Sequence, residues 1–593
     1  MIEYELKISN PGSHLVDIAV VVRDFQTDKL DLILPSWSPG SYLIRDYAKS
    51  VVKTEACDEK GRVLECRKMA KNIWRLEGLK SNYCRFVYQV YCYEIGTSSS
   101  LVDDQHASLH GPSLFVYPVG MEESPCQLSL KFPSTWTEVS TGLEPVPGAE
   151  QIFKTESYHQ LLDCPIEIGN HQVLNFEVQG VPHSIALYGK GNVDVEKLKK
   201  DVQSIVRQEL LVFDHIPYKH YTFIIQLLSR RGGGLEHQNS TLIQVSRWKF
   251  SPEEEYRKTL SLIAHEFFHL WNVKRLAPKP LVHFDYTKEN YTDLLWAAEG
   301  ITSYYQDLLL LRCGLYTPAQ YFETIMDFYK EYLQSPGRGV QSLCESSFDA
   351  WIKFYKLRLE ESFRNLTISY YNKGALIGLA LDLLLRHSTG NRITLDQALR
   401  ELYHQTYLSS FTGYTLQDFK NVCENLSGKS FEDFFADHIQ GRKELNLGEY
   451  LNLAGLKLVP KNDKTLGSGY LGVELRKNEN QAVITSVSWN TPAFAAGISP
   501  GDEIVAWDGH RVFAHTLPER IKEAKPGSEH HVSLFRDEEW REVKVSVGEK
   551  PAEWRICRVE NPGTEAVDLL KSWIGTTELN EEKKHPDTVA AVQ

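Results

Sequence analysis

The sequence predicts a multidomain α+β protein with an all-β domain first, a mainly helical domain next and a small β-rich module last. Three observations lead to this prediction. The chain has 593 residues, several times the usual length of one domain. Its hydrophobic periodicity changes twice along the sequence. Hydrophobic residues make up 42% and charged residues 24%, as in ordinary globular proteins, so each part is expected to bury a core.

Residues 1–170 form the predicted N-terminal β domain, which we expect to be sandwich-like. Short alternating or β-branched runs at 16–22, 84–93 and 127–132 are separated by turn formers such as Pro39-Gly40. The alternation begins within the first ten residues, which have neither the basic nor the apolar segment of a signal peptide. We therefore expect a cytoplasmic location, unless a leader has been removed.

Residues 171–453 form the predicted second domain, mainly helical with a small sheet. Strands at 221–228 and 241–245 come first. Helix starts are then predicted near Ser251, Thr292, Thr317, Thr394, Thr415 and Ser430. The longest apolar run, 374–385, contains Asp382 and is shorter than the roughly 18 to 20 residues of a membrane helix. It predicts a buried helix, and no membrane partner is expected.

Residues 454–550 form the predicted third module. β-branched runs at 483–487, 532–535 and 543–547 lie between Gly and Pro turns, as in a small β-rich domain. Residues 551–577 are expected to form a short C-terminal extension. Residues 578–593 are polar and lack aromatic side chains, which predicts a disordered tail.

The charge balance and the cysteines exclude some classes of function. The formal net charge is −13, so the average field repels nucleic acids and anionic membranes, and neither is expected as a partner. The ten cysteines include no CxxC pair and form no dense secreted framework. We expect them to be reduced, and most of them buried.

The HEFFH motif predicts a metal site. On a helix, His265 and His269 share one face with Cβ atoms about 6 Å apart, so they can bind a single ion. Glu266 is placed to act on a water as general base rather than to bind the metal. Ser251 and Glu254 predict a capping box at the start of this helix. The motif is typical of a zinc metallopeptidase with one Zn²⁺ per chain, although the same ligands accept cobalt or manganese.

A catalytic zinc usually has three protein ligands and one open position. Glu299 is the preferred third ligand, because it lies in a segment that is predicted to form a second helix from Thr292. His283 is the competing candidate, and it lies in the Pro-rich connection after Pro280.

Several segments together resemble the gluzincin metallopeptidases, above all the glycyl aminopeptidase family with a C-terminal PDZ domain, and more distantly aminopeptidase N. The segments are WSPGSYLIRDYAKSV at 37–51, GGGLEH at 232–237, HEFFHLWNVKR at 265–275, WAAEGITSYY at 296–305, YYNKGALIGLALD at 370–382 and a PDZ-like region from Gly469. The resemblance covers nearly the whole chain and implies a thermolysin-like catalytic domain. The gap from His269 to Glu299 is longer than in thermolysin or aminopeptidase N.

The resemblance implies that His265, His269 and Glu299 bind the metal and that Glu266 is the catalytic base. It also implies that Glu236 binds the free amino terminus of the substrate, with Gly233 and Gly234 beside it in the substrate site. We expect this carboxylate on a Gly-rich loop between the two strands. The alternative is a hairpin-like turn with exposed charges.

Tyr371 matches the Tyr of the Tyr-x-Lys-Gly stretch that stabilises the oxyanion in aminopeptidase N relatives. A phenol suits that role because it donates a hydrogen bond to charge that develops in the transition state. Tyr370 is an adjacent candidate, and the alternative role for Tyr371 is a core tyrosine at a helix start. The WSPGSY segment has no chemistry of its own and is expected to be a structural or substrate-rim feature.

The segments at 469–473 and 496–504 resemble a PDZ domain. In this resemblance Tyr470, Leu471, Gly472 and Val473 form the carboxylate-binding loop, and the C-terminus of a peptide partner adds a strand to the sheet. The alternative is a module that only packs against the catalytic domain.

The leading hypothesis is a zinc aminopeptidase that hydrolyses the N-terminal bond of peptide substrates. The resemblance implies small first residues, Gly or Ala. One alternative is a zinc endopeptidase that the PDZ-like module guides to its substrates. Another is a non-catalytic peptide-binding scaffold, against which the intact Glu266 argues.

Overall fold

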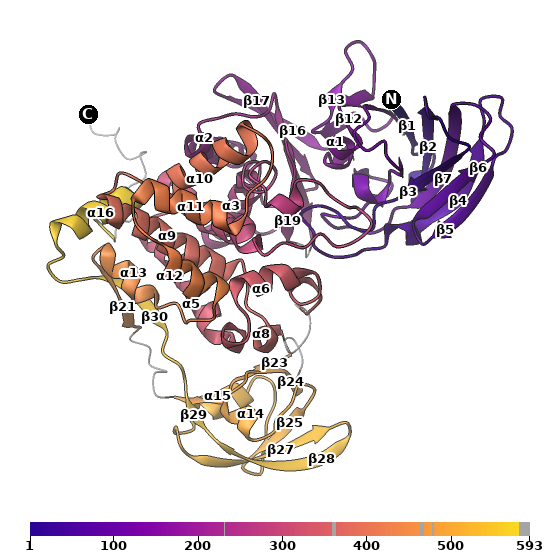
Figure 1. Ribbon diagram of the computed structural model, residues 1–593. Helices are drawn as coiled ribbons and strands as arrows, with labels where there is room; N and C mark the ends of the chain where they lie inside the picture. The colour runs from indigo at the N-terminus through magenta and orange to yellow at the C-terminus, as the bar shows by residue number, and fades with distance from the viewer. Residues whose placement is uncertain (230–231, 358–362, 462–467, 477–479, 580–593) are drawn as a thin grey trace, which may run out of the picture. The chain divides into compact units, whose positions relative to one another are not determined.

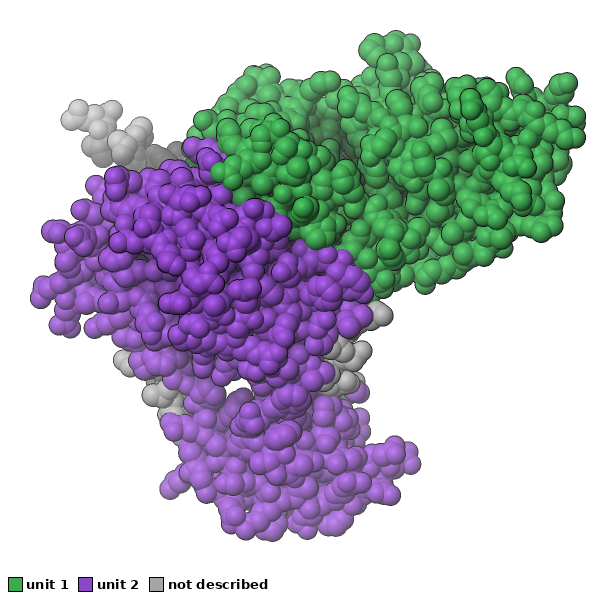
Figure 2. Space-filling model, viewed as in Figure 1, with its two compact units in different colours: residues 1–290, 312–315, 402–414 green, residues 291–311, 316–401, 415–593 purple. Residues whose placement is uncertain are grey.

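The computed structural model describes residues 1–229, 232–357, 363–461, 468–476 and 480–579. The predicted fold class is confirmed: β sheets come first, helices form the middle of the chain, and a β module follows (Figure 1). The chain divides into two compact units, residues 1–290 with 312–315 and 402–414, and the remainder (Figure 2). From residue 580 onward the predicted tail lies outside the described residues, and the predicted domain boundaries stay predictions.

The N-terminal part of the first unit contains three β sheets around one large apolar core. The seven-stranded sheet consists, in order, of β13 (Glu144–Pro145), β14 (Ile152–Thr155), β11 (Cys126–Lys131), β1 (Ile2–Lys7), β2 (Leu15–Arg23), β7 (Tyr83–Tyr91) and β4 (Val51–Cys57). The second consists of β10 (Tyr117–Pro118), β3 (Lys29–Ile33), β6 (Ile73–Glu77) and β5 (Glu65–Ala70). The third consists of β12 (Glu138–Thr141), β15 (Ile166–Gly169), β9 (His106–Leu109) and β8 (Leu101–Val102). A short helix, α1 (Tyr158–Leu162), follows β14.

The first unit also contains the five-stranded sheet that carries part of the site. Its strands, in order, are β16 (Gln172–Val178), β17 (Val181–Tyr188), β18 (Tyr221–Leu228), β20 (Ser240–Ser246) and β19 (Gly233–Glu236). β18 pairs in parallel with β17 and β20 and is buried at every position, as expected for a central strand. Helix α2 (Val195–Phe213) connects β17 to β18.

The GGGLEH segment corrects a prediction. It forms the edge strand β19, antiparallel to β20, rather than a loop. The register pairs Gly233 with Gln244 and Glu236 with Thr241. Pairing with β20 therefore extends the sheet through this segment, although its glycines suggested a turn.

Helix α3 (Glu253–Phe268) carries the HEFFH motif and packs on β19 and β20. The predicted capping box is wrong, because Pro252 occupies the N-cap position and no side-chain cap bond forms. Three glutamates in the first turn, Glu253 to Glu255, instead complement the positive end of the helix dipole.

Helices form the centre of the chain after α3. They are α4 (Ile301–Arg312), α5 (Pro318–Gln334), α6 (Leu343–Phe348), α7 (Phe354–Leu357), α8 (Phe363–Leu366), α9 (Asn372–Thr389), α10 (Leu395–Tyr403), α11 (Leu416–Ser427), α12 (Glu432–Phe435) and α13 (Leu447–Leu453). Helices α5 and α11 start at Thr317 and Thr415 as predicted, and each begins with a capping box. The apolar run at 374–385 lies in α9, which is buried against α5, α11 and α13. None of the described helices is long and apolar enough to cross a membrane.

The C-terminal β module has its own apolar core. One sheet runs in the order β23 (Val473–Leu475), β24 (Ala482–Val487), β25 (Glu503–Trp507), β27 (Glu529–Arg536) and β28 (Glu539–Ser546), with β26 (His510–Arg511) on β25. β22 (Gly469–Tyr470) pairs with β29 (Gly548–Glu549), and the module contains helices α14 (Pro492–Ala495) and α15 (Leu517–Glu523). β21 (Leu456–Pro460) pairs with β30 (Trp554–Arg558), and α16 (Thr564–Ile574) follows.

Candidate metal centre

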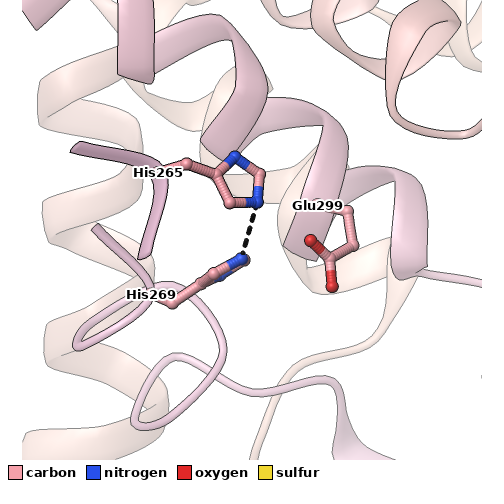
Figure 3. A group of neighbouring side chains, drawn as sticks. All are labelled: His265, His269 and Glu299. Atoms are coloured by element: carbon pink, nitrogen blue, oxygen red, sulfur yellow. Dashed lines mark hydrogen bonds between the residues drawn. The ribbon is translucent and has the colours of Figure 1, made fainter. Parts of the chain in front are cut away.

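The two histidines of the HEFFH motif converge at the C-terminal end of α3. His265 lies in the last turn, His269 is the C-cap, and both are buried. Their Nε2 atoms are 3.0 Å apart (Figure 3). Two imidazoles bound to a tetrahedral zinc at 2.0–2.1 Å place these atoms about 3.3 Å apart. The His269 Nδ1–H donates to the Asn272 carbonyl at 2.7 Å, so Nε2 is the nitrogen of this ring that can bind a metal.

Glu299 completes a three-residue group. One ligand atom from each of His265, His269 and Glu299 lies within 4.8 Å of the others, and all three residues are buried (Figure 3). Two imidazoles and one carboxylate are the donor set of a catalytic zinc with an open position, so the residues fit this metal. His283, the competing third ligand, belongs to neither of the metal-compatible groups found among the described residues.

The segment that carries Glu299 differs from the predicted helix. A π-helical turn, Trp296–Gly300, leads directly into α4, so the helical segment starts later than Thr292. Turns of this kind occur often at functional sites, because the wider coil redirects one side chain.

Two glycines bring Tyr371 close to Glu299. A Cβ built on Gly300 would lie 2.4 Å from the Gly374 Cα, so the π-helical turn touches the first turn of α9 backbone to backbone. Tyr371 is the N-cap of α9 and is half-buried, whereas Tyr370 is completely buried. Burial, followed by the Glu299 charge, raises the pKa of Tyr371 well above its ordinary value. The phenol therefore stays protonated and can donate a hydrogen bond.

Strand β19 brings Glu236 close to Glu266 and His269. Glu236 is only 4% exposed, which contradicts the alternative of a turn with exposed charges. Ligand atoms of Glu236, Glu266 and His269 lie within 4.8 Å of one another. A Cβ built on Gly234 would lie 2.2 Å from the Glu266 Cδ, so this part of the strand passes directly against the predicted general base. Gly233, with φ of +127°, precedes it.

A polar clamp, which the sequence did not predict, holds the residues just after Glu236. The Asp163 carboxylate accepts from the Gln238 N–H at 2.7 Å and pairs with Lys274 Nζ at 2.5 Å. Arg275 Nη1 donates to the Gln238 carbonyl at 2.9 Å. Burial raises the pKa of Asp163, but Lys274 and His237 outweigh it and hold that pKa well below its usual range. The two basic residues after the HEFFH motif were the signal that could have indicated this clamp.

A cavity of about 340 Å³ borders Glu236. The WSPGSY segment lines it through Ser38, Pro39, Gly40 and Tyr42. The connection after α3 lines it with apolar side chains, including Val282 and Phe284. Apolar walls with a few polar groups are typical of sites for small molecules.

Three family profiles match the chain. The Peptidase M61 N-terminal domain matches residues 3–170, M61 glycyl aminopeptidase matches residues 258–377, and a PDZ domain matches residues 469–547. The chain belongs to the M61 glycyl aminopeptidase family. As an M61 protein it is a zinc metallopeptidase with the HExxH and distant Glu site, and it carries a PDZ domain.

Two solved structures illustrate what the chain is similar to. An aminopeptidase N family protein from Idiomarina loihiensis is 29% identical, covers 97% of this chain and 100% of its own, and superposes with a TM-score of 0.90. An M1 zinc metallopeptidase from Deinococcus radiodurans is 14% identical, covers 75% of this chain and 94% of its own, and has a TM-score of 0.49. No curated protein matches the chain.

The PDZ domain of this M61 protein contains the loop predicted to bind a carboxylate. Tyr470 ends β22, the Leu471 side chain is buried in the module's core, and Val473 begins β23. Gly472 has φ of +80°, and its carbonyl accepts from the Ser488 N–H at 2.9 Å. β23 is the last strand in its sheet, so one of its edges pairs with no other described strand.

Proposed function

We propose that this M61 protein is a zinc-dependent aminopeptidase that removes the first residue of peptides. The observation that supports it best is the position of Glu236, within 4.8 Å of ligand atoms of Glu266 and His269. The amine nitrogen and carbonyl carbon of one residue are only about 2.5 Å apart. A buried carboxylate that binds the ammonium here therefore brings the first carbonyl to the base and the metal ligands.

Each residue has a role in this proposal. His265, His269 and Glu299 hold one zinc per chain, and the bound zinc supplies a Lewis acid that also lowers the pKa of water. Glu266 takes the proton of the attacking water and passes it to the leaving amine. Because Gly234 has no side chain, β19 can lie directly against the Glu266 carboxylate. Tyr371, whose raised pKa keeps the phenol protonated even in alkaline solution, donates a hydrogen bond to the oxyanion.

The family name, glycyl aminopeptidase, supports a preference for Gly as the first residue, and we extend the proposal to the similarly small Ala. Hydrolysis of a series of aminoacyl amides that differ only in the first residue measures this preference directly. Rates that rise with the size of the first side chain would contradict it.

The test of the main proposal compares alanine-initiated peptides with a free and with an acetylated amino terminus. We expect cleavage of the first bond of the free peptide and at least about tenfold less of the acetylated one, because a charge-assisted hydrogen bond contributes about 1.5–3 kcal/mol. Equal cleavage of both, or cleavage inside the peptide, would favour the endopeptidase alternative. Unchanged hydrolysis by a Glu266→Gln variant would favour the scaffold.

We further propose that the PDZ domain binds peptide C-termini. The free edge of β23 supports this, because an extended peptide can add a strand there while the Tyr470–Val473 loop receives its carboxylate. Fluorescence anisotropy with a peptide library tests it. Binding of peptides with a free carboxylate and not of their C-terminal amides is expected, and indifference to amidation would contradict it.

A further inference from the structure

The WSPGSY segment forms a tight turn in the first unit. The Ser41 N–H donates to the Ser38 carbonyl at 3.0 Å, and Gly40 within the turn has φ of +86°, a conformation that favours glycine. Trp37, just before the turn, is completely buried and donates from Nε1 to the Asp285 carbonyl at 2.8 Å. These bonds fix the position of the turn.

Gly40 lies directly against the Glu236 carboxylate. A Cβ built on Gly40 would be 2.6 Å and 2.7 Å from the two carboxylate oxygens, and 2.7 Å from Cδ1 of Leu235. Real Cβ atoms almost never approach another atom so closely. A side chain at position 40 and the present position of the Glu236 carboxylate therefore exclude each other. The sequence indicated a turn at Pro39-Gly40 but did not show this contact.

We propose that the turn Ser38–Ser41 is one wall of the ammonium subsite and that Gly40 is a positioning residue for Glu236. The proposal rests on the proposed aminopeptidase function. Glu236 has a flexible side chain, and an anchor for an ammonium works best when it is held in place before the substrate arrives. The polar clamp fixes the backbone after Glu236, and the Gly40 backbone limits where its carboxylate can go.

The turn also bounds the space next to the anchor, because Gly40 and Glu236 line the same cavity of about 340 Å³. The N-terminal M61 domain, which the family profile matches at 3–170, thus supplies part of the substrate site and is more than a support for the catalytic domain.

The competing explanation is that position 40 needs glycine only for its backbone conformation. Gly120 provides a matched control, because it has a φ of +80° and nothing within 4 Å of its built Cβ. Gly120→Ala introduces the same backbone strain without a collision. Any effect that Gly40→Ala has beyond that of Gly120→Ala comes from the contacts with Glu236 and Leu235, and the Glu236→Ala background separates the two.

The experiment measures kcat and KM of the full-length, zinc-loaded wild type and of the alanine variants. Each protein is assayed with an alanine-initiated peptide and with the acetylated form of that peptide. We expect Gly40→Ala to raise KM for the free peptide about tenfold or more with a smaller change in kcat, and to reduce the discrimination against the acetylated peptide. Zinc content should equal that of Gly120→Ala. In a Glu236→Ala background Gly40→Ala should add less than about twofold, because both changes act on one interaction.

Additive effects of the two substitutions, or equal kinetics for Gly40→Ala and Gly120→Ala, would overturn the proposal. A wild-type chain that does not discriminate against the acetyl group would instead overturn the aminopeptidase function. If Gly40→Ala does not fold, Gly40→Ala combined with Glu236→Asp replaces it. The shorter carboxylate withdraws from position 40, so relative to Glu236→Asp alone this double variant should lose only as much stability as Gly120→Ala loses relative to wild type. A larger loss also overturns the proposal.

Discussion

The metal-binding end of α3 and the ammonium anchor on β19 are built in different ways. His265, Glu266 and His269 lie within five consecutive residues, and helix geometry alone places them together. Glu236 depends on Asp163, Arg275 and Gly40, which come from separate parts of the sequence. The difference teaches that the metal-binding end of α3 tolerates distant changes, whereas the anchor on β19 depends on long-range packing.

The largest effect is expected at the general base. Glu266→Gln should lower kcat about 10²- to 10⁴-fold, because the amide cannot accept the proton. Zinc content should not change, since Glu266 is not one of the three proposed ligands. Steady-state kinetics together with metal analysis measure both quantities. Loss of zinc in this variant would show that Glu266 also contributes to metal binding and is not a general base alone.

The next effect is expected at the anchor. Glu236→Gln removes the charge that pairs with an ammonium and should lower kcat/KM for free peptides about 10- to 100-fold, while acetylated peptides react as before. The control is Glu177→Gln, an exposed glutamate on β16 of the same sheet. Equal losses of kcat/KM for free and acetylated peptides would indicate that Glu236 acts on the metal-binding end of α3 instead of binding the ammonium.

A smaller effect on activity is expected from Asp163→Asn, which leaves Lys274, only 8% exposed at its side chain, without its charge partner. Breaking a buried pair in this way costs about 3–5 kcal/mol of stability. The free-peptide kcat/KM should fall several-fold because residue 238 is less firmly held. Thermal unfolding and kinetics measure the two effects. Removing both charges with Asp163→Asn and Lys274→Met should restore part of the stability, and no recovery would contradict the role of the pair.

The smallest effect on activity is expected at Glu209 on α2, which packs against α3. Glu209 is completely buried, its oxygens have no hydrogen-bond partner among the described residues, and burial raises its pKa well above 4.5. The native state therefore retains a proton that the unfolded chain loses above pH 4.5, so stability falls as pH rises from that value toward the native pKa.

Glu209→Gln removes this dependence. Its stability relative to wild type should grow between pH 5 and 8 by up to about 1.4 kcal/mol per pH unit. Melting temperatures of the two proteins across this range measure it, and a constant difference would contradict the raised pKa. Peptidase activity and zinc content should not change, because the metal-binding end of α3 is built locally.

The sequence predicted local features well and distant contacts poorly. Residues 221–228 were predicted as a strand and are β18, and the helix starts at Thr317 and Thr415 have capping boxes. The HEFFH residues were found because helical spacing is a local property. GGGLEH was mistaken for a loop because glycines weaken a strand pattern while pairing with β20 overrides it. The contacts of Gly40 with Glu236 and of Asp163 with Gln238 were not predicted, since these partners lie far away in the sequence.

The backbone contact between Gly300 and Gly374 has a practical consequence for anyone redesigning this enzyme. Any side chain added at either glycine pushes the π-helical turn away from α9, so metal affinity and oxyanion binding would be lost together and neither could be tuned alone from that side. The phenol can be reached in another way. Tyr355 on α7 is hydrogen-bonded to Tyr371, and substitutions there would change the acidity of the phenol while leaving the three metal ligands in place.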